Sequence, residues 1–142
     1  MENKIKYIIT SIGGCVSAFV NNYLGGWGGY TITLLIIMLI DYITGVFVAL
    51  VFKNSPKTES GSYTSKAGYK GIIKKCSMLL MVLLGVRLDI TLNVNYFQIG
   101  VTVAIILNEL YSIKENLELM EIKIPFVDKI IEYIKNLGDN KK

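Results

Sequence analysis

Charged side chains inside otherwise apolar stretches are the residues of this sequence that could do chemistry. Asp41 interrupts the apolar run of residues 30–52 near its middle, and Glu109 lies towards the end of the run of residues 96–113. A carboxylate at the centre of a lipid bilayer costs roughly 2.5–3.5 kcal/mol on insertion scales, so we expect each one to face a cation or water rather than lipid. The sequence therefore predicts an intramembrane charge network with five candidate members: Asp41, Lys74, Lys75, Arg87 and Glu109.

The expected depths of these residues leave the pairing within the network open. Arg87 is expected near the outer side of a membrane, Asp41 near its midplane and Glu109 near the inner side, so these three side chains cannot meet in one layer. Asp41 then either contacts Lys74 or Lys75, or faces a hydrated interior.

Catalysis is not expected from this sequence. It has no histidine, which excludes imidazole catalysis and histidine-ligated metal sites. No nucleophile–base pair, metal-ligand cluster or paired catalytic carboxylates can be assembled, and the glycine run of residues 25–29 lacks the strand that precedes a phosphate-binding loop. We predict a protein that is not an enzyme and uses no cofactor.

Long apolar stretches must position the charged residues. Of 142 residues, 52% are hydrophobic and 18% charged, and residues 7–40 and 76–86 contain no charge at all. This pattern predicts an all-α polytopic membrane protein rather than a soluble bundle, which would need more polar surface. Residues 1–113 are the predicted transmembrane domain, with four spans at about 7–24, 30–52, 72–90 and 96–113.

The lysines predict the orientation of these spans. Lys4 and Lys6 precede the first span, and residues 53–75 carry six lysines against one acidic residue. The turns at residues 25–29 and 91–95 carry no lysine, so the positive-inside bias places both termini in the cytoplasm. We interpret the basic loop as this orientation signal, not as a nucleic-acid site. A three-span alternative places the first segment on the membrane surface.

Small and polar side chains recur on one face of the first two predicted spans. Such a face either packs against another helix or lines water inside an oligomer. A third interpretation of the first segment is a signal peptide that is cleaved near Cys15. The candidate pore-lining or helix-packing residues are Thr10, Gly14, Ser17, Asn21, Asp41, Thr44 and Gly45.

Residues 114–142 are predicted to form a cytoplasmic tail with an amphipathic helix. Pro125 suits a first helical turn and Gly138 a helix end. The tail carries six lysines and six acidic residues, and this balance favours self-association over electrostatic binding to the inner leaflet, which is the alternative. The self-association face consists of Phe126, Val127, Ile130, Ile131, Ile134 and Leu137.

Four short motifs stand in order over about residues 35–137. They are Asp41-x-x-Thr44-Gly45 in one span, Ser65-x-x-Gly68-x-x-Gly71-x-x-Lys74-Lys75 at the start of the next, Asn108-Glu109-x-x-Ser112-Ile113-x-Glu115-Asn116 at the end of the last, and Ile124-Pro125 before the tail. In this order, and in a chain of this size, the sequence resembles the toxin-secretion and phage-lysis holins, a bacteriophage holin family that includes clostridial toxin-release holins.

The resemblance implies a small integral protein of the bacterial host's cytoplasmic membrane. Such a protein oligomerises with itself and opens holes that release an endolysin, or a toxin, and so time host lysis. The implied partners are sister copies, membrane lipid and that cargo, with no nucleic acid. Two alternatives stay open: a membrane anchor or regulatory subunit, and a small ion-coupled transporter built around Asp41 and Glu109.

Overall fold

The computed structural model describes the backbone of residues 2–139 and the side chains of residues 2–136. Over this range the chain is helical and contains no strand, which confirms the predicted all-α class. The five α-helices and one π-helical segment are α1 (Glu2–Tyr23), α2 (Gly29–Phe47), η1 (Val48–Phe52), α3 (Ser65–Leu92), α4 (Phe97–Leu119) and α5 (Pro125–Asp139).

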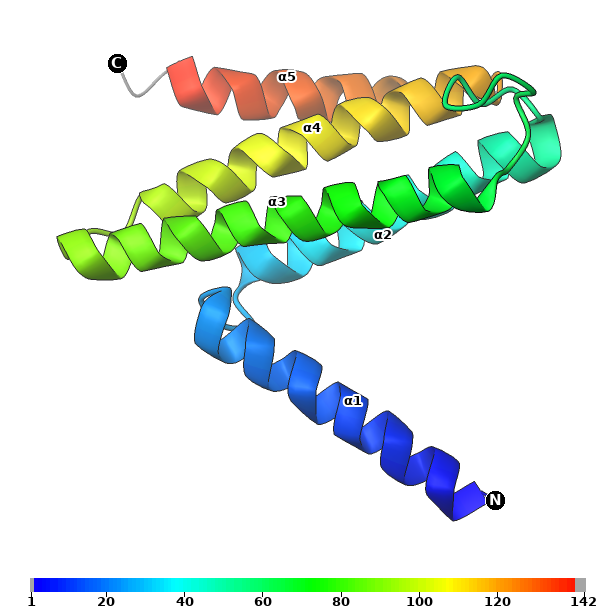
Figure 1. Ribbon diagram of the computed structural model, residues 1–142. Helices are drawn as coiled ribbons and strands as arrows, with labels where there is room; N and C mark the ends of the chain where they lie inside the picture. The colour runs from blue at the N-terminus through cyan, green and yellow to red at the C-terminus, as the bar shows by residue number, and fades with distance from the viewer. Residues whose placement is uncertain (1, 140–142) are drawn as a thin grey trace.

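Helix α4 lies at the centre of the molecule. It packs against α2 and α3, which run alongside it, and α5 lies along its outer side (Figure 1). The helices pack through one apolar core, with a buried side chain from α5 as well as from the bundle. This core consists of Val20, Leu24, Leu34, Met38, Val82, Ile105, Ile106, Leu110 and Ile131.

A tight turn joins α3 to α4. Asn93 ends α3 in the left-handed conformation, with φ 51°. The Asp89 carboxylate then accepts hydrogen bonds from the backbone N–H groups of Phe97 and Gln98, both at 2.9 Å. A carboxylate at a helix N-terminus satisfies donors that have no partner within the helix. Asp89 therefore serves as the cap that fixes α4 beside α3.

Helix α1 projects away from the bundle (Figure 1). Only its C-terminal end is anchored: Val20 and Leu24 are buried, while almost all of residues 2–19 are exposed. Two side chains hold the turn after α1, because Gln98 Nε2 donates to the Leu24 carbonyl at 2.9 Å and Thr31 Oγ1 donates to it at 3.2 Å.

One described helix, running from Gly29 to Phe52 through α2 and η1, is long and apolar enough to cross a membrane. It has 24 residues, and only 28% of its most apolar stretch is buried within the chain. Helices α1, α3 and α4 contain charged and amide side chains that make them less apolar. The other three predicted spans therefore remain predictions.

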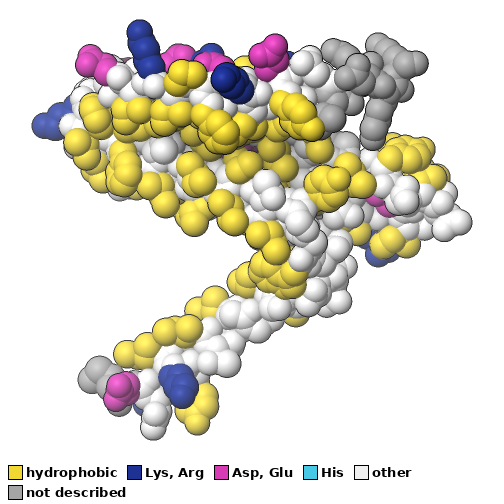
Figure 2. Space-filling model, turned by 180° about the vertical axis from the view of Figure 1, so that it is seen from behind, with side chains coloured by type: hydrophobic (Ala, Val, Ile, Leu, Met, Phe, Trp, Pro, Cys, Tyr) yellow, Lys and Arg dark blue, Asp and Glu magenta, His cyan; other side chains and the backbone are white. Residues whose placement is uncertain are grey.

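Apolar side chains cover much of the molecular surface, both on the bundle and on α1 (Figure 2). Ile36 and Leu39 of α2 and Leu80 and Leu84 of α3 are each at least half exposed. Soluble monomers rarely carry contiguous apolar patches of more than a few hundred Å². This surface therefore requires lipid or other chains to cover it.

Candidate functional site

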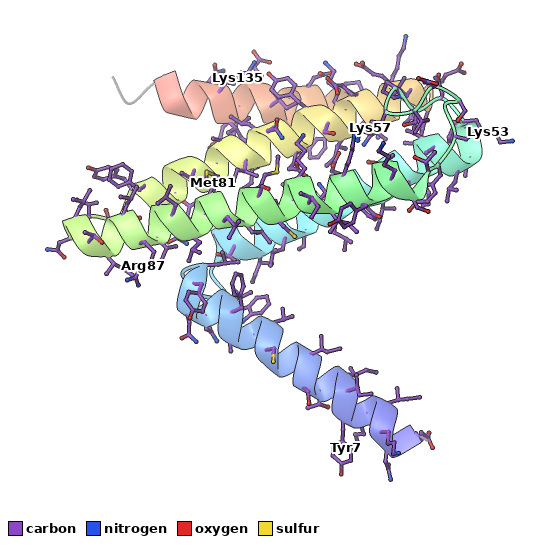
Figure 3. The ribbon with its side chains drawn as sticks, in the orientation of Figure 1. Tyr7, Lys53, Lys57, Met81, Arg87 and Lys135 are labelled. Atoms are coloured by element: carbon purple, nitrogen blue, oxygen red, sulfur yellow. The ribbon has the colours of Figure 1, made fainter. Side chains whose placement is uncertain are left out.

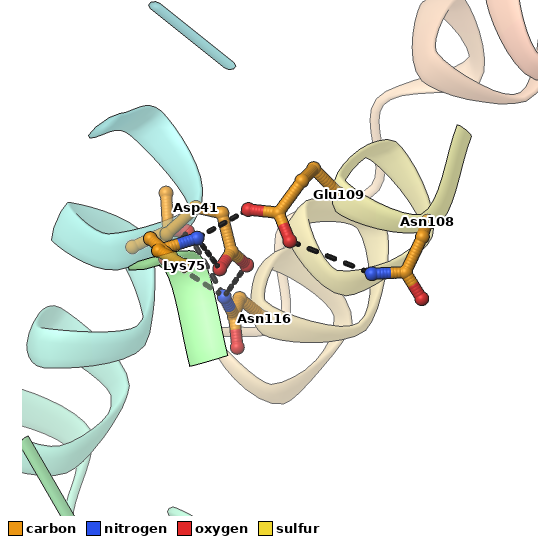
Figure 4. A network of polar contacts seen from close by, with 6 residues as sticks. Asp41, Lys75, Asn108, Glu109 and Asn116 are labelled. Carbon is orange, nitrogen blue, oxygen red and sulfur yellow. Dashed lines mark hydrogen bonds and ion pairs between the residues drawn. The ribbon is translucent and has the colours of Figure 1, made fainter. Parts of the chain in front are cut away.

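Helices α2, α3 and α4 each contribute one charged side chain to a buried cluster (Figure 4). Lys75 Nζ donates to Asp41 Oδ2 at 2.8 Å and also pairs with Glu109 Oε2. Asp41 is 8% exposed and Glu109 1% exposed. One ammonium group therefore bridges two carboxylates inside the bundle and links all three helices.

Asn116 completes the surroundings of Asp41. Its Nδ2 lies 3.2 Å from Asp41 Oδ1, 3.3 Å from the Asp41 carbonyl and 3.0 Å from Thr44 Oγ1. Thr44 Oγ1 in turn donates to the Asp41 carbonyl at 3.0 Å. Because residues seven apart lie on one face of a helix, α4 directs both Glu109 and Asn116 into the cluster, where Glu109 meets Lys75 of α3 and Asn116 meets α2.

The cluster is suited to holding helices together rather than to reacting with a substrate. Removing one partner of a buried ion pair leaves an uncompensated charge and costs about 3–5 kcal/mol. Within the part of the chain that the structure describes, no group of three acidic or cysteine side chains is placed to hold a metal ion.

The structure brings together three of the five residues predicted for the charge network. Lys75 contacts Asp41, whereas the neighbouring Lys74 lines an adjacent cavity. Arg87 lies about 18 Å further along α3, since twelve helical residues separate it from Lys75, near the end of α3 that adjoins α4 (Figure 3). Asp41 and Glu109 were expected at different depths, but their carboxylates contact the same Lys75 Nζ atom and therefore lie at one level of the bundle.

Asn116 is the member of the cluster that the sequence did not predict. It appeared only as the end of a motif, with no contact assigned to it. Its spacing from Glu109 was the available signal, because an amide on the same helical face as a buried carboxylate is well placed to donate to a second one.

The predicted polar face of α1 contacts no other described helix. Thr10 Oγ1 donates to the backbone of its own helix, and nothing lies within 4 Å of a Cβ built on Gly14. Ser17 accepts a hydrogen bond at 3.3 Å from Trp27, and Asn21 is exposed. Its assignment to a pore or to helix packing stays a prediction.

The predicted polar face of α2 lies against α4 in the single chain. Asp41 and Thr44 bond Asn116, and a Cβ on Gly45 would lie 3.6 Å from Asn116 Nδ2. These contacts are those of close packing between two helices of one copy. Any contact of this face with water in an oligomer would require α2 and α4 to separate.

The apolar face of α5 packs onto the chain's own core. Ile131 is buried, and Val127, Ile130 and Ile134 pack around it, while Phe126 is 67% exposed. Leu137 lies outside the described side chains. Both roles expected from the sequence, leaflet binding and self-association, require this face to be free, but α4 occupies most of it. An intermolecular role for the tail remains a prediction.

Polar contacts also fix α5 to the end of α4. Lys114 Nζ lies 2.6 Å from Asp128 Oδ1 and 3.8 Å from Glu118 Oε1. The hydrogen bond that Lys114 donates to the Asp128 carboxylate is the main cause that raises the pKa of Lys114 above its ordinary value. Lys135 Nζ lies 5.0 Å from the ring centre of Tyr111, within range of a cation–π contact.

Residues 18–137 match the bacteriophage holin family. An uncharacterized 14.9 kDa protein of Clostridium perfringens is 32% identical over 99% of this chain and 100% of its own length. An uncharacterized protein of Listeria innocua is 32% identical over 92% of this chain and 84% of its own. A protein of Bacillus phage phi105 with the name "Probable holin" is 33% identical over 74% of this chain and 73% of its own. No solved structure matches the chain.

The family match spans α2 to α4 entirely and includes every residue of the buried cluster. The chain therefore belongs to the bacteriophage holin family, a family of non-enzymatic membrane proteins.

Proposed function

We propose that this protein oligomerises in the bacterial cytoplasmic membrane and opens holes through which an endolysin, or a toxin, leaves the cell. Membership of the holin family and the relative from phage phi105 support this function. The exposed apolar surface of α2 and α3 supports contact with lipid and with sister copies.

We propose four membrane spans with both termini in the cytoplasm. Helices α1, α3 and α4 have 22, 28 and 23 residues. At 1.5 Å per residue they measure about 33, 42 and 35 Å, enough for a hydrocarbon core of about 30 Å. The basic 53–64 loop and the start of α3 would then lie on the cytoplasmic side.

The contacts of each helix indicate its role in the proposed assembly. Helices α2, α3 and α4 form the body of one copy, because the Asp41–Lys75–Glu109 cluster satisfies their buried charges internally. Almost all described side chains of helix α1 before Val20 are exposed. In the assembled hole, the polar face of α1 lines water and its apolar face contacts lipid or neighbouring copies.

The observation that carries this proposal is the unpartnered α1. A helix with a polar stripe and exposed Ile8, Ile9 and Ile12 has no stable place in lipid or in water as an isolated element. Copies that shelter one another's α1 satisfy both surfaces at once.

Inducible expression in a bacterium with a potential-sensitive dye tests the function. We expect growth to stop and the membrane potential to collapse abruptly, and co-expressed endolysin to lyse the culture at that moment. Gly14→Leu, which places a bulky side chain in the polar stripe, should delay or abolish the collapse, while Ile9→Leu, on the apolar side, should not. Normal growth at high levels of inserted protein would refute the proposal.

Crosslinking of the detergent-extracted protein separates the proposed function from a membrane anchor or regulatory subunit. A hole-forming protein gives a ladder of its own oligomers. An anchor gives a complex with a different chain and leaves the potential intact.

A further inference from the structure

A cavity of about 320 Å³ lies beside the buried charge cluster. It is bounded by α2 and η1, by the 53–64 loop, by the first turns of α3 and by one turn of α4. Asp41, Ala49 and Ser55 form its buried part. Its size falls in the range of small-molecule sites in proteins, which begins at about 300 Å³.

Three lysines without a carboxylate partner line this cavity. Lys57, Lys70 and Lys74 belong to the lining, and none of them forms an ion pair with any described residue. Lys75 is paired with two carboxylates in the buried cluster, Asp41 and Glu109, so that cluster carries one negative charge in excess. Outside that cluster, the lining holds these three ammonium groups against the single carboxylate of Glu115, an excess of two positive charges.

Hydroxyl groups surround the same space. Ser55, Thr58, Ser62 and Tyr63 all belong to the lining. A Cβ on Gly68 would collide with the Tyr63 hydroxyl, so the absence of a side chain there lets this hydroxyl lie against α3. Ammonium groups together with hydroxyl donors are the groups that bind a phosphate.

The side of the cavity formed by α2 and η1 is partly apolar. Beside Asp41 and Tyr42 it contains Val46 and Ala49, which belong to the helix long enough to cross a membrane. Phe47 and Leu50, beside them on that helix, are each at least half exposed. The cavity therefore joins a cationic wall to an apolar surface that faces lipid in the proposed arrangement.

We propose that this cavity binds the phosphate-bearing headgroup of an anionic phospholipid from the cytoplasmic leaflet. Lys57, Lys70 and Lys74 contact the phosphate, and the acyl chains run along the exposed side of α2 and η1. Basic pockets between membrane helices on the cytoplasmic side recognise such headgroups. The apolar wall selects a lipid over a free anion. This proposal relies on the membrane location in the proposed function, but not on hole formation.

The test measures lipid retention by the purified full-length protein in a neutral detergent, by native mass spectrometry. Phosphatidylglycerol, phosphatidylcholine and inorganic phosphate are titrated separately. We expect phosphatidylglycerol to bind at least tenfold more tightly than phosphatidylcholine. Lys57→Gln/Lys74→Gln should weaken its binding about 25-fold, because each lysine near an anionic headgroup contributes roughly a fivefold factor. Lys57→Arg/Lys74→Arg should retain binding.

The matched control is Lys53→Gln/Lys66→Gln, which removes the same charge from the same region. Neither residue lines the cavity, and Lys53 lies at the tip of the bundle where η1 ends, away from Lys57 (Figure 3). The affinity of this control variant for phosphatidylglycerol should change less than threefold. Equal losses in the two double variants would mean diffuse attraction and overturn the site. Equal binding of the two lipids, or saturation by inorganic phosphate alone, would overturn it as well.

Hole formation is scored separately, by the membrane potential of expressing cells. A protein that binds phosphatidylglycerol selectively but leaves the potential intact refutes the proposed function and keeps the site. A protein that collapses the potential but shows no lipid selectivity supports the proposed function and overturns the lipid site.

Discussion

Lys75→Met tests the interpretation that the buried cluster holds α2, α3 and α4 together. Methionine keeps most of the length of the lysine side chain but removes the ammonium that bridges Asp41 and Glu109. At the 2.8 Å contact with Asp41, the gross attraction is about 6 kcal/mol for an effective dielectric constant of about 20. Desolvation offsets part of it, so the expected loss of stability is about 3–5 kcal/mol.

The assay is unfolding of the purified protein in mild detergent, followed by helical circular dichroism during a titration with a denaturing detergent or heating. For a chain of this size, a loss of 3–5 kcal/mol lowers the melting temperature by on the order of 10 °C. Lys66→Met is the matched control, because Lys66 also belongs to α3, is exposed, forms no ion pair with a described residue and lies outside the proposed lipid site. It should change stability by less than about 0.5 kcal/mol.

A third variant separates the loss of a bridge from the loss of a side chain. Asp41→Asn/Lys75→Met/Glu109→Gln removes all three charges, so no unpaired charge stays buried. It should recover most of the stability lost in Lys75→Met. If Lys75→Met and Lys66→Met unfold alike, or if the triple variant is as unstable as the single one, the cluster does not hold the helices.

Three further outcomes follow from the structure. Gly85→Ala should lower the free energy of unfolding by about 1–3 kcal/mol in the same assay, because the new Cβ would lie 3.0 Å from Gln98 Cα. Gly100→Ala, with open space around it, should not lower this free energy. Equal effects of the two variants would contradict the close approach of α3 and α4. Asp89→Ala should lower the free energy of unfolding by about 1–2 kcal/mol, because it removes the cap of α4. Amide hydrogen exchange in the first turn of α4 should become faster, and unchanged exchange there would contradict the cap. Asp41→Asn should change the time of hole opening in a lysis assay more than the amount of inserted protein, because neutralisation weakens the bond to Lys75 and lowers the cost of insertion; lysis timing identical to the parent would make Asp41 a structural charge only.

The helical class and the positions of the helices could be predicted because both follow from local pattern. The apolar run of residues 30–52 reappears as α2 and η1, and Pro125 begins α5 as expected. Helix ends that carry charges were harder to predict. Helix α3 begins at Ser65, ahead of the predicted span, because the Thr64 side chain caps it by accepting a hydrogen bond from the Ala67 N–H.

The partners of the charged residues could be predicted only as alternatives. Lys74 and Lys75 are neighbours in sequence but point about 100° apart on a helix, and only the packing of α3 decides which one meets Asp41. The position of α5 was beyond sequence reasoning for a similar reason. Its apolar face is compatible with lipid, with a sister copy and with α4, and the amphipathic pattern is the same for all three.

Release of a trapped protein from lipid vesicles tests most directly whether this chain opens holes. The purified protein is added to vesicles of phosphatidylglycerol and phosphatidylcholine that contain both a small dye and a fluorescent globular protein of endolysin size. We predict that both contents escape once the added protein exceeds a threshold density. Retention of both contents at every density, with the chain inserted, would contradict the function proposed for it.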